Sequence, residues 1–266
     1  MHNIESSKKY FVIPQSLEEF GVTVFGKDEN EILFKIKKDE YLPAEETFVV
    51  SRFNKKFYLI LSIDLNNIPT LSHEAVILSR VKNMPKKLKN DKSEKLPIIG
   101  FFELASVILL WNDKDKCYKF MDSWNGKFGK DLFLDFLLPK PAIVSSSTDV
   151  VSLNGAVYDF IKVMSMPPDA ITIHPDWKFT ITEDIDNPVL LEFDVFEKPR
   201  KQASPAFLLA IMVKEHLKAI KKETGKRPTK LGFRLLDEFE SPEARKRVEA
   251  GLKEACEMIK IGFFLL

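Results

Sequence analysis

Cysteine and histidine, the residues that a thiol-dependent active site needs, are few in this chain. It contains two cysteines, Cys117 and Cys256, and four histidines. A cysteine acts as a nucleophile when a histidine holds its proton and a carboxylate or amide orients the imidazole. Cys117, His73 and Asp122 could supply these three roles, with Cys256 as the alternative thiol. Thiol-dependent hydrolysis is therefore one function that the sequence suggests.

The residues around Cys117 form the most informative pattern in the sequence. The apolar residues Val107 to Trp111 and the mainly apolar run 117–121 flank the polar break Asn-Asp-Lys-Asp, which predicts an antiparallel hairpin. An Asp-Ser-Trp-Asn-Gly turn follows at 122–126. The stretch Ala105–Phe136 resembles the C-terminal hairpin of papain-like cysteine peptidases. In that family, a strand opening on the catalytic His precedes a strand that ends in Asn-Ser-Trp-Gly.

The resemblance implies a catalytic site, but the residues that the family needs are missing. Ala105 stands where the family has its His, and no cysteine precedes Cys117, so the upstream nucleophile has no counterpart. Asp122 matches the orienting Asn of the family, and Trp124 matches the indole that shields it. We therefore expect a structural relict of a papain-like hairpin, which would make this protein a pseudoenzyme. A papain-like hydrolase with a rearranged site is the alternative.

Carboxylates offer a second kind of chemistry. The order strand–strand–strand–helix–strand–helix is predicted from Ile171 onwards, with Asp237 closing the fourth strand and Glu215 in the preceding helix. This order permits an RNase-H-like two-metal nuclease. Its first strand, residues 171–174, lacks the acid that such a site requires, so we rank the nuclease below the hydrolase.

The remaining metal and phosphate signals are weak. Glu192 and Asp194 lie two apart in a predicted strand and so share one face, where they could bind a metal or simply face solvent. The sequence has no short spacing of Cys and His residues that suits zinc, and no Gly-rich phosphate loop. We therefore expect neither a metal nor a cofactor.

Composition limits the partners and the compartment. Forty Lys and Arg face 39 Asp and Glu, so the formal net charge is +1 and gives no general attraction to polyanions. The lysine-rich segments 82–95 and 218–230 lack interleaved aromatics, so there is no strong nucleic-acid signal. No apolar run approaches the ~20 residues of a membrane span. Two cysteines and a polar start without a secretory signal favour the cytoplasm.

The pattern of elements predicts an α+β protein with mostly antiparallel sheets, helices packed on one face, and two domains. Pro139, Pro141 and the serines at 145–147 interrupt the hydrophobic periodicity together. We therefore expect a β-rich α+β domain over residues 1–141, which contains the papain-like hairpin. A second α+β domain over residues 148–266 would contain a helix, three strands, a helix, a strand and a helix.

Two helices have clear signals at their ends. Ser204 and Pro205 begin a long helix that ends at Gly225, and Ser241 caps the last helix. A further helix is predicted over residues 73–81, which would place His73 in its first turn.

The chain contains one apolar segment that needs a partner or a sheet to cover it. This tail, Phe263, Phe264, Leu265 and Leu266, must dock either as a final strand or on another protein. Together with the missing catalytic residues and the near-neutral charge, it favours a non-catalytic protein–protein interaction component. We expect a subunit, adaptor or chaperone-like protein whose partner is another protein or a second copy of the chain.

Overall fold

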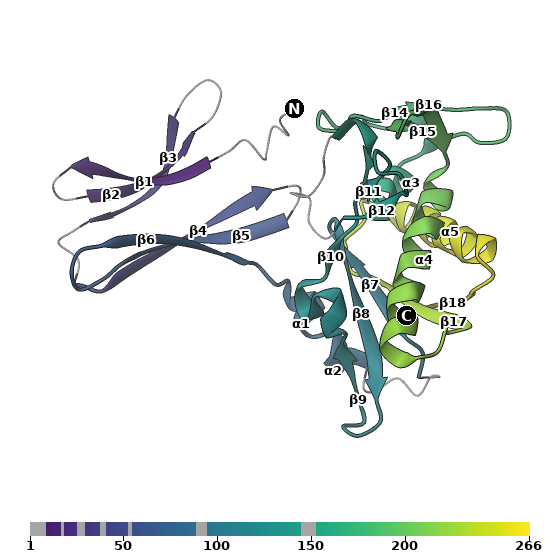
Figure 1. Ribbon diagram of the computed structural model, residues 1–266, viewed down its shortest axis with the longest axis horizontal. Coiled ribbons are helices and arrows are strands. Elements are labelled where there is room, and N and C mark those ends of the chain that lie inside the picture. Colours follow the sequence, from purple (N-terminus) through teal and green to yellow (C-terminus); the bar gives the residue numbers. More distant parts are fainter. Residues whose placement is uncertain are drawn as a thin grey trace. The chain divides into compact units, whose positions relative to one another are not determined.

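The computed structural model describes residues 9–16, 19–25, 30–37, 41–52, 55–88, 95–144 and 153–266. The chain divides into two compact units, residues 1–76 and 77–266 (Figure 1). Several mostly antiparallel sheets combine with a few helices, so the predicted α+β class is confirmed.

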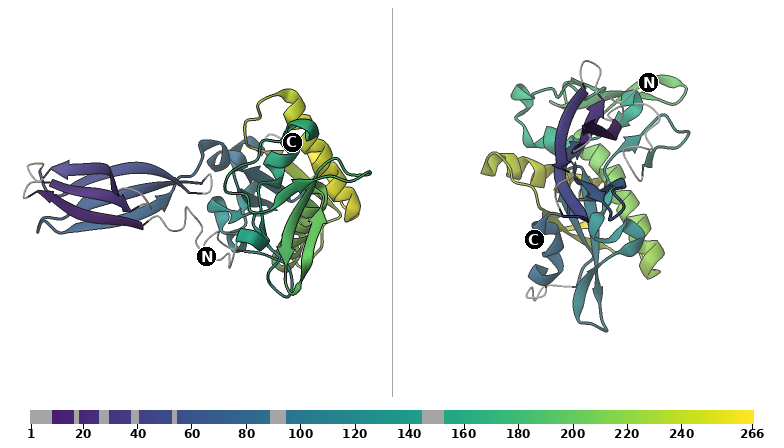
Figure 2. Two further views of the ribbon diagram at one scale, coloured as in Figure 1. Left: turned by 90° about the horizontal axis from the view of Figure 1, so that it is seen from above. Right: turned by 90° about the vertical axis from the view of Figure 1, so that its left-hand side faces the viewer.

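The first unit consists of two antiparallel three-stranded sheets with one core between them (Figure 2). Alternate residues of the central strand of the second sheet, Leu59, Leu61 and Ile63, are buried in this core, as a period of two requires. Phe34 and Phe48 stack at 5.6 Å between ring centroids and join the two sheets. The strands are β1 (Lys9–Ser16), β2 (Glu19–Phe25), β3 (Asn30–Lys37), β4 (Ala44–Arg52), β5 (Lys55–Ile63) and β6 (Pro69–Ala75).

The second unit is built on a mixed sheet with the order β10-β8-β7-β17-β18, and β9 pairs with β8 on the same side as β10. Strands β7, β8 and β9 are antiparallel neighbours, whereas β17 runs parallel to β7 and β18 runs parallel to β17. The strands are β7 (Ile98–Phe102), β8 (Ala105–Asn112), β9 (Cys117–Phe120), β10 (Lys130–Asp131), β17 (Lys230–Leu235) and β18 (Gly262–Leu265).

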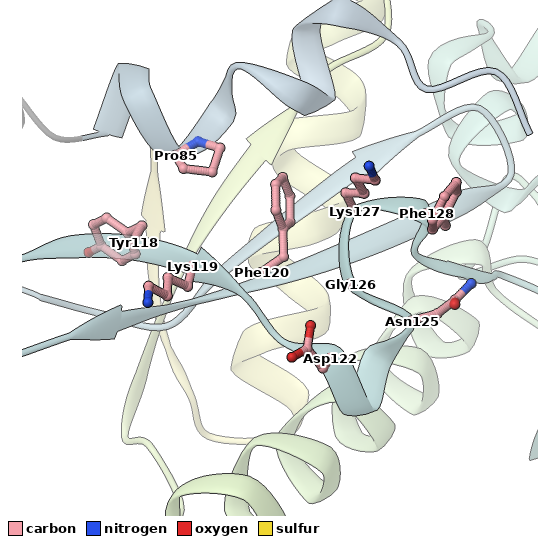
Figure 3. Close-up of a pocket in the computed structure, with 9 residues that line it drawn as sticks. All are labelled: Pro85, Tyr118, Lys119, Phe120, Asp122, Asn125, Gly126, Lys127 and Phe128. Carbon is pink, nitrogen blue, oxygen red and sulfur yellow. The ribbon is translucent and has the colours of Figure 1, made fainter. Parts of the chain in front are cut away.

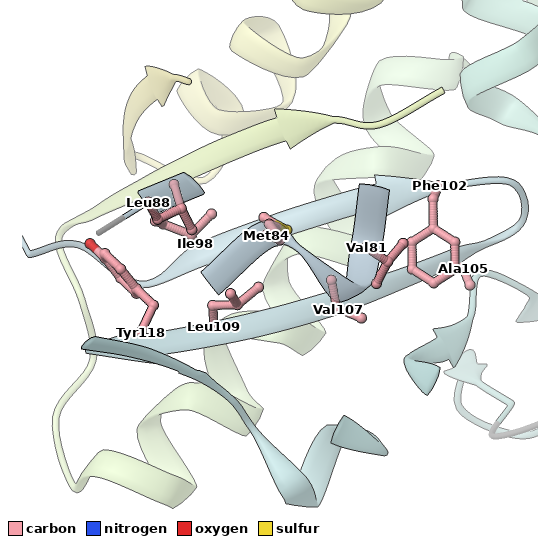
Figure 4. Close-up of a cluster of buried hydrophobic side chains, with 9 residues drawn as sticks. All are labelled: Val81, Met84, Leu88, Ile98, Phe102, Ala105, Val107, Leu109 and Tyr118. Atoms are coloured by element: carbon pink, nitrogen blue, oxygen red, sulfur yellow. The ribbon is translucent and has the colours of Figure 1, made fainter. Parts of the chain in front are cut away.

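Helices cover both faces of this sheet, so the prediction that helices pack on one face is wrong. The short helices α1 (Ser79–Lys82) and α2 (Met84–Leu88) lie on one face, where Met84 and Val107 belong to the buried cluster in Figure 4. On the other face, Ser106 of β8 contacts His216 of α4 (Pro205–Thr224). The physical reason is that, apart from Ser106, β7 and the first half of β8 contain only apolar residues and glycine, and both are buried throughout.

The remaining elements of the second unit form two small antiparallel sheets and two further helices. Strand β11 lies between β12 and β13, and β15 lies between β14 and β16. The elements are β11 (Leu134–Asp135), β12 (Ala142–Ile143), β13 (Ala156–Val157), α3 (Phe160–Ser165), β14 (Thr180–Thr182), β15 (Leu190–Val195), β16 (Lys198–Ala203) and α5 (Pro242–Met258), with single 3-10 turns at Leu153–Gly155 and Pro168–Ala170.

The predicted boundary between residues 141 and 148 falls inside the second unit. Strand β11 pairs with β12 and β13, and β7 pairs with β17, so hydrogen bonds of two sheets join the two sides of that boundary. Prolines and serines interrupt local periodicity, but they carry no information about strands that pair over long stretches of sequence. The division lies between Val76 and Ile77 instead. The serine run at 145–147 is outside the described residues.

The helix predictions succeeded where capping signals were present. Ser204 accepts a hydrogen bond from the Phe207 amide at 3.2 Å, and Gly225 ends α4 with φ of 73°. Ser241 caps α5 through the Ala244 amide in the same way. Both predictions are confirmed. Neither of these helices, nor any other in the described part of the chain, is long and apolar enough to span a bilayer.

The predicted helix over residues 73–81 is wrong. Residues 69–75 form β6, and the helix α1 begins only at Ser79. In β6, Ser72 and His73 pair with Ile60 and Leu59 of β5. Pairing with a neighbouring strand therefore decided the local structure there, against the weak capping signal of a single serine.

Candidate functional site

The strand order expected of an RNase-H-like site occurs in the second unit, but other strands form it. Strands β7, β8 and β9 are followed along the chain by α4, β17 and α5, whereas β14, β15 and β16 belong to a separate sheet. Residues 171–174, predicted as the first strand, form no strand. The first strand of the actual order, β7, reads Ile-Ile-Gly-Phe-Phe and contains no carboxylate.

Asp237 follows the fourth strand of this order, as predicted, but its carboxylate is already bonded. It accepts hydrogen bonds from the Arg80 guanidinium at 3.2 Å and from the Glu103 amide at 2.9 Å. Burial raises the pKa of Asp237, and the nearby Asp159 raises it further. Glu215 of α4 pairs with Lys218 at 2.5 Å. Within the described ranges no three His, Cys, Asp or Glu side chains gather in a way that could hold a metal ion.

The predicted pair of carboxylates on β15 faces an arginine. Arg200 of β16 lies 3.1 Å from a carboxylate oxygen of Glu192 and 3.1 Å from one of Asp194. Its guanidinium also donates to the Glu192 carbonyl at 2.9 Å. One cation between two acids neutralises part of their charge, so this strand face has a structural explanation that needs no metal.

The residues of the predicted thiol site belong to different elements of the chain. Cys117 is the first residue of β9, and Asp122 begins the turn η1 (Asp122–Trp124) that follows this strand. His73 belongs to β6 of the first unit, where it is exposed beside the Phe57 ring. Cys256 is buried in α5, and burial raises the pKa of its thiol to about 12. A thiol-dependent site that uses His73 therefore stays a prediction.

We expect Cys256 to resist alkylation in the folded protein at neutral pH. A thiol with a pKa of about 12 is almost entirely protonated at pH 7.5, and its burial denies access to the reagent. Iodoacetamide followed by peptide mass spectrometry should modify Cys256 only after denaturant is added. Rapid modification of this residue in native protein, with loss of a peptidase activity, would contradict the non-catalytic interpretation.

A buried serine–histidine pair lies under the turn that follows β9. Ser106 Oγ and His216 Nε2 are 2.7 Å apart, and both residues are fully buried. His216 Nδ1 donates to the Met212 carbonyl at 2.7 Å, because a carbonyl can only accept. Nε2 of the neutral ring is then the acceptor for the Ser106 hydroxyl. This spacing suits a nucleophile and its base, but burial excludes substrate, so the pair is structural.

Trp124 connects this buried pair to the turn. Its indole N–H donates to both the carbonyl and the hydroxyl of Ser106 at 3.1 Å, and its ring lies 4.5 Å from the His216 ring. Trp124 ends the 3-10 turn η1 (Asp122–Trp124), which continues through Asn125 into η2 (Gly126–Phe128). The buried pair therefore holds η1 at one point.

Two further contacts hold the same turn. Ser123 donates to Glu223 near the end of α4 at 2.6 Å. The Asn125 side chain donates to the Gly129 carbonyl at 2.9 Å and closes η2. Asn125 itself has a left-handed φ of 62°. Held at several points, the turn can present the outward side chains of Asp122 and Lys127 in a defined position.

A surface pocket of about 580 Å³ opens between this turn, β9 and α2 (Figure 3). We call it the hairpin pocket. Phe120 lies in its middle, with Pro85 of α2 above it and Lys127 beside it, while Asp122 lies on the lower side (Figure 3). The pocket is lined by Pro85, Tyr118, Lys119, Phe120, Asp122, Asn125, Gly126, Lys127 and Phe128.

The hairpin pocket combines aromatic surface with charge. The Phe128 ring is 41% exposed, and the Lys127 ammonium lies 5.4 Å from its centroid. Lys119 pairs with Asp115, whose hydrogen bond raises the pKa of the lysine. Lys127 makes no ion pair with a described residue. Such a mixture suits binding of an amphipathic ligand and supplies no nucleophile with its base.

The residues that hold this turn include one that the sequence patterns did not indicate. Asp122 and Trp124 were chosen for their match to a peptidase motif, and they do lie at the pocket and beneath it. His216 was overlooked, although a histidine among the apolar residues Met212, Val213 and Leu217 of a buried helix face signals a buried partner.

The predicted apolar tail is part of the sheet. Its first three residues lie in β18, where Phe263 stacks on Phe233 at 5.5 Å, and Leu266 packs against the cluster in Figure 4. Phe264 stays 36% exposed, with the Lys230 ammonium 5.3 Å from its ring centroid. The alternative of a final strand is thus confirmed, and deletion of the tail would remove a strand of the fold.

No protein-family profile matches the chain, and its sequence matches no curated protein.

Proposed function

We propose that this protein is a non-catalytic component of a protein complex, an adaptor or subunit, that binds its partner at the hairpin pocket. The observation that carries the proposal is the pocket itself, which lies on a turn anchored through Trp124 to the buried Ser106 and His216. Rigid aromatic and cationic side chains at one place are typical of contact residues in protein interfaces.

The positions of the candidate catalytic groups agree with this proposal. The Cys256 thiol is buried, and burial raises its pKa to about 12, while the first strand of the nuclease-like order has no acid. We place the protein in the cytoplasm, where the unpaired Cys117 and Cys256 would stay reduced.

Photo-crosslinking tests the proposal. A photoreactive phenylalanine analogue would replace Phe128 in the full chain, and in a control protein it would replace Phe207, which is 50% exposed on α4. In extracts of the cells that make the protein, we expect a discrete adduct from position 128 and none from position 207. The mass of the adduct distinguishes another protein from a second copy.

A variant with reversed charge at the pocket shows whether the crosslink depends on Lys127. Lys127→Glu should suppress the adduct from position 128, because the lysine lines the pocket beside Phe128. Equal adducts from both positions, or an adduct that survives Lys127→Glu unchanged, would count against a partner at this pocket.

The RNase-H-like nuclease is the second candidate, because the strand order of the second unit and the place of Asp237 fit it. Its test is cleavage of single- and double-stranded RNA and DNA with Mg²⁺ or Mn²⁺. We expect no cleavage, since β7 lacks a carboxylate and Asp237 is bonded to Arg80. Metal-dependent cleavage that is abolished by Asp237→Asn would overturn the non-catalytic proposal.

A further inference from the structure

We propose that the partner enters the hairpin pocket as an extended peptide segment that pairs with the outer edge of β9 and adds a strand to the sheet. This inference rests on the proposed function and specifies how its site binds. Addition of a strand to an open sheet edge is a common mode of peptide recognition.

The lining of the pocket shows that it lies along an edge. Tyr118, Lys119 and Phe120 all line it, and they are consecutive residues of β9. Consecutive side chains of a strand point to opposite faces of the sheet, so a pocket on one face could not contact all three through their side chains alone. A groove that follows the edge of the strand can.

The other edge of β9 is occupied by β8, and in the described chain no strand pairs with the outer edge. Strand β9 therefore lies at an edge of the described sheet, and the backbone of Phe120 is the part of this edge that concerns the pocket. Edge strands offer unpaired donors and acceptors to a further strand.

Hydrogen-bond alternation identifies the backbone groups on that side. The Met121 amide donates to the Ile108 carbonyl at 2.8 Å, and Phe120 pairs with Leu109 in the same register. In an antiparallel ladder, pairs with and without mutual hydrogen bonds alternate along the strand. Phe120 is thus in a pair without them, and its N–H and C=O point away from β8, toward the pocket.

The side chains around the edge specify what the peptide should carry. Pro85, Phe120 and Phe128 provide apolar surface for one hydrophobic or aromatic residue. The ammonium of Lys127 can receive a carboxylate, since no described acid pairs with it, whereas Lys119 is occupied by Asp115. Asp122 lies on the opposite side of the pocket in Figure 3, so the acidic residue belongs at the Lys127 end. The occupant is therefore a short extended segment with an apolar and an acidic residue.

A random peptide library displayed on phage and panned on the full-length protein supplies the probe. We expect enrichment of short peptides that combine an apolar or aromatic residue with Asp or Glu. The best synthetic peptide would then be methylated at one backbone nitrogen at a time and titrated against unmodified protein by fluorescence anisotropy. Methylation should weaken binding about tenfold at alternate positions, where the amide faces β9, and have little effect at the positions between.

Variants of the protein test the same backbone contact between the peptide and β9. Phe120→Pro removes the outward N–H without removing a hydrogen bond to β8, and Phe120→Ala is the matched control that loses the ring but keeps the N–H. We expect the peptide to bind Phe120→Pro about tenfold more weakly than Phe120→Ala. Lys127→Glu should weaken binding about as much, while Lys114→Glu, in the exposed turn before β9, should not.

Several results would overturn strand addition. Tolerance of N-methylation at every position would show that side chains alone hold the peptide, as would equal affinities of Phe120→Pro and Phe120→Ala. The methylation series uses unaltered protein, so it decides the question even if Phe120→Pro does not fold. A crosslink from position 128 without any of these backbone effects would leave the interaction function standing and reject only the strand. Absence of both crosslinks and enriched peptides would reject the two proposals together.

Discussion

Replacing Gly129 by alanine is expected to lower the free energy of unfolding by about 3 kcal/mol. Gly129 has φ of 69° and ψ of −179°, a backbone conformation that essentially only glycine adopts. A Cβ atom there would lie 2.4 Å from the Ser106 carbonyl oxygen, well inside van der Waals contact. That oxygen accepts the Trp124 indole N–H, so relief of the clash would disturb the contact that holds η1.

Gly225→Ala is the matched control for this substitution. Gly225 has a similar φ of 73°, but no described atom lies within 4 Å of the position of its Cβ. Only the left-handed conformation is then unfavourable, and we expect a loss of about 1 kcal/mol. Chemical denaturation of both variants gives the comparison. Equal losses would mean that the backbone of Ser106 can move away from position 129 at little cost.

Acid is expected to destabilise the protein through His216 by up to about 3 kcal/mol. Burial lowers the pKa of His216 from 6.5 to about 4, and the nearby Lys130 lowers it as well. Above pH 6.5 the imidazole is neutral in both the folded and the unfolded chain, so it causes no pH dependence. Between 6.5 and about 4 the unfolded chain takes up a proton that the folded chain excludes. The free energy of unfolding therefore falls as the pH falls through this window.

The comparison of wild type with His216→Gln isolates this effect. Asp159 and Asp237 act in the opposite direction, because burial raises the pKa of each and the folded chain holds their protons more tightly. They are present in both proteins, so their contribution cancels in the difference. We expect the stability advantage of wild type over His216→Gln to shrink by about 3 kcal/mol from pH 7 to pH 4. Parallel curves of stability against pH would show that His216 does not carry the acid sensitivity.

Local features of the fold followed from the sequence. The hairpin of β8 and β9, the turn at 122–126 and the ends of α4 depend on neighbouring residues, namely a polar break, turn residues and caps. The predictions that failed concern positions where residues far apart in the chain determine the local structure. Residues 73–75 became part of β6 because β5 lies beside them. The predicted boundary between 141 and 148 falls inside one unit because β7 pairs with β17 across it.

The candidate site divides in the same way. The motif around Asp122 and Trp124 lies in the turn beside the pocket, and the peptidase resemblance itself stays a prediction. Ser106 and His216 are 110 residues apart in the chain, so no local pattern could show that they meet under that turn. The pocket likewise needs Pro85 from a helix that precedes the hairpin.

The sequence by itself determined the α+β class, the hairpin and the helix ends, because periodicity, turns and caps act over a few residues. Only the tertiary structure decided which strands share a sheet, and hence that β9 is at an edge. It also decided that the serine and histidine are buried together and hold a turn. Pairing and burial depend on residues that are close in space and far apart in the chain, and a single sequence does not reveal that proximity.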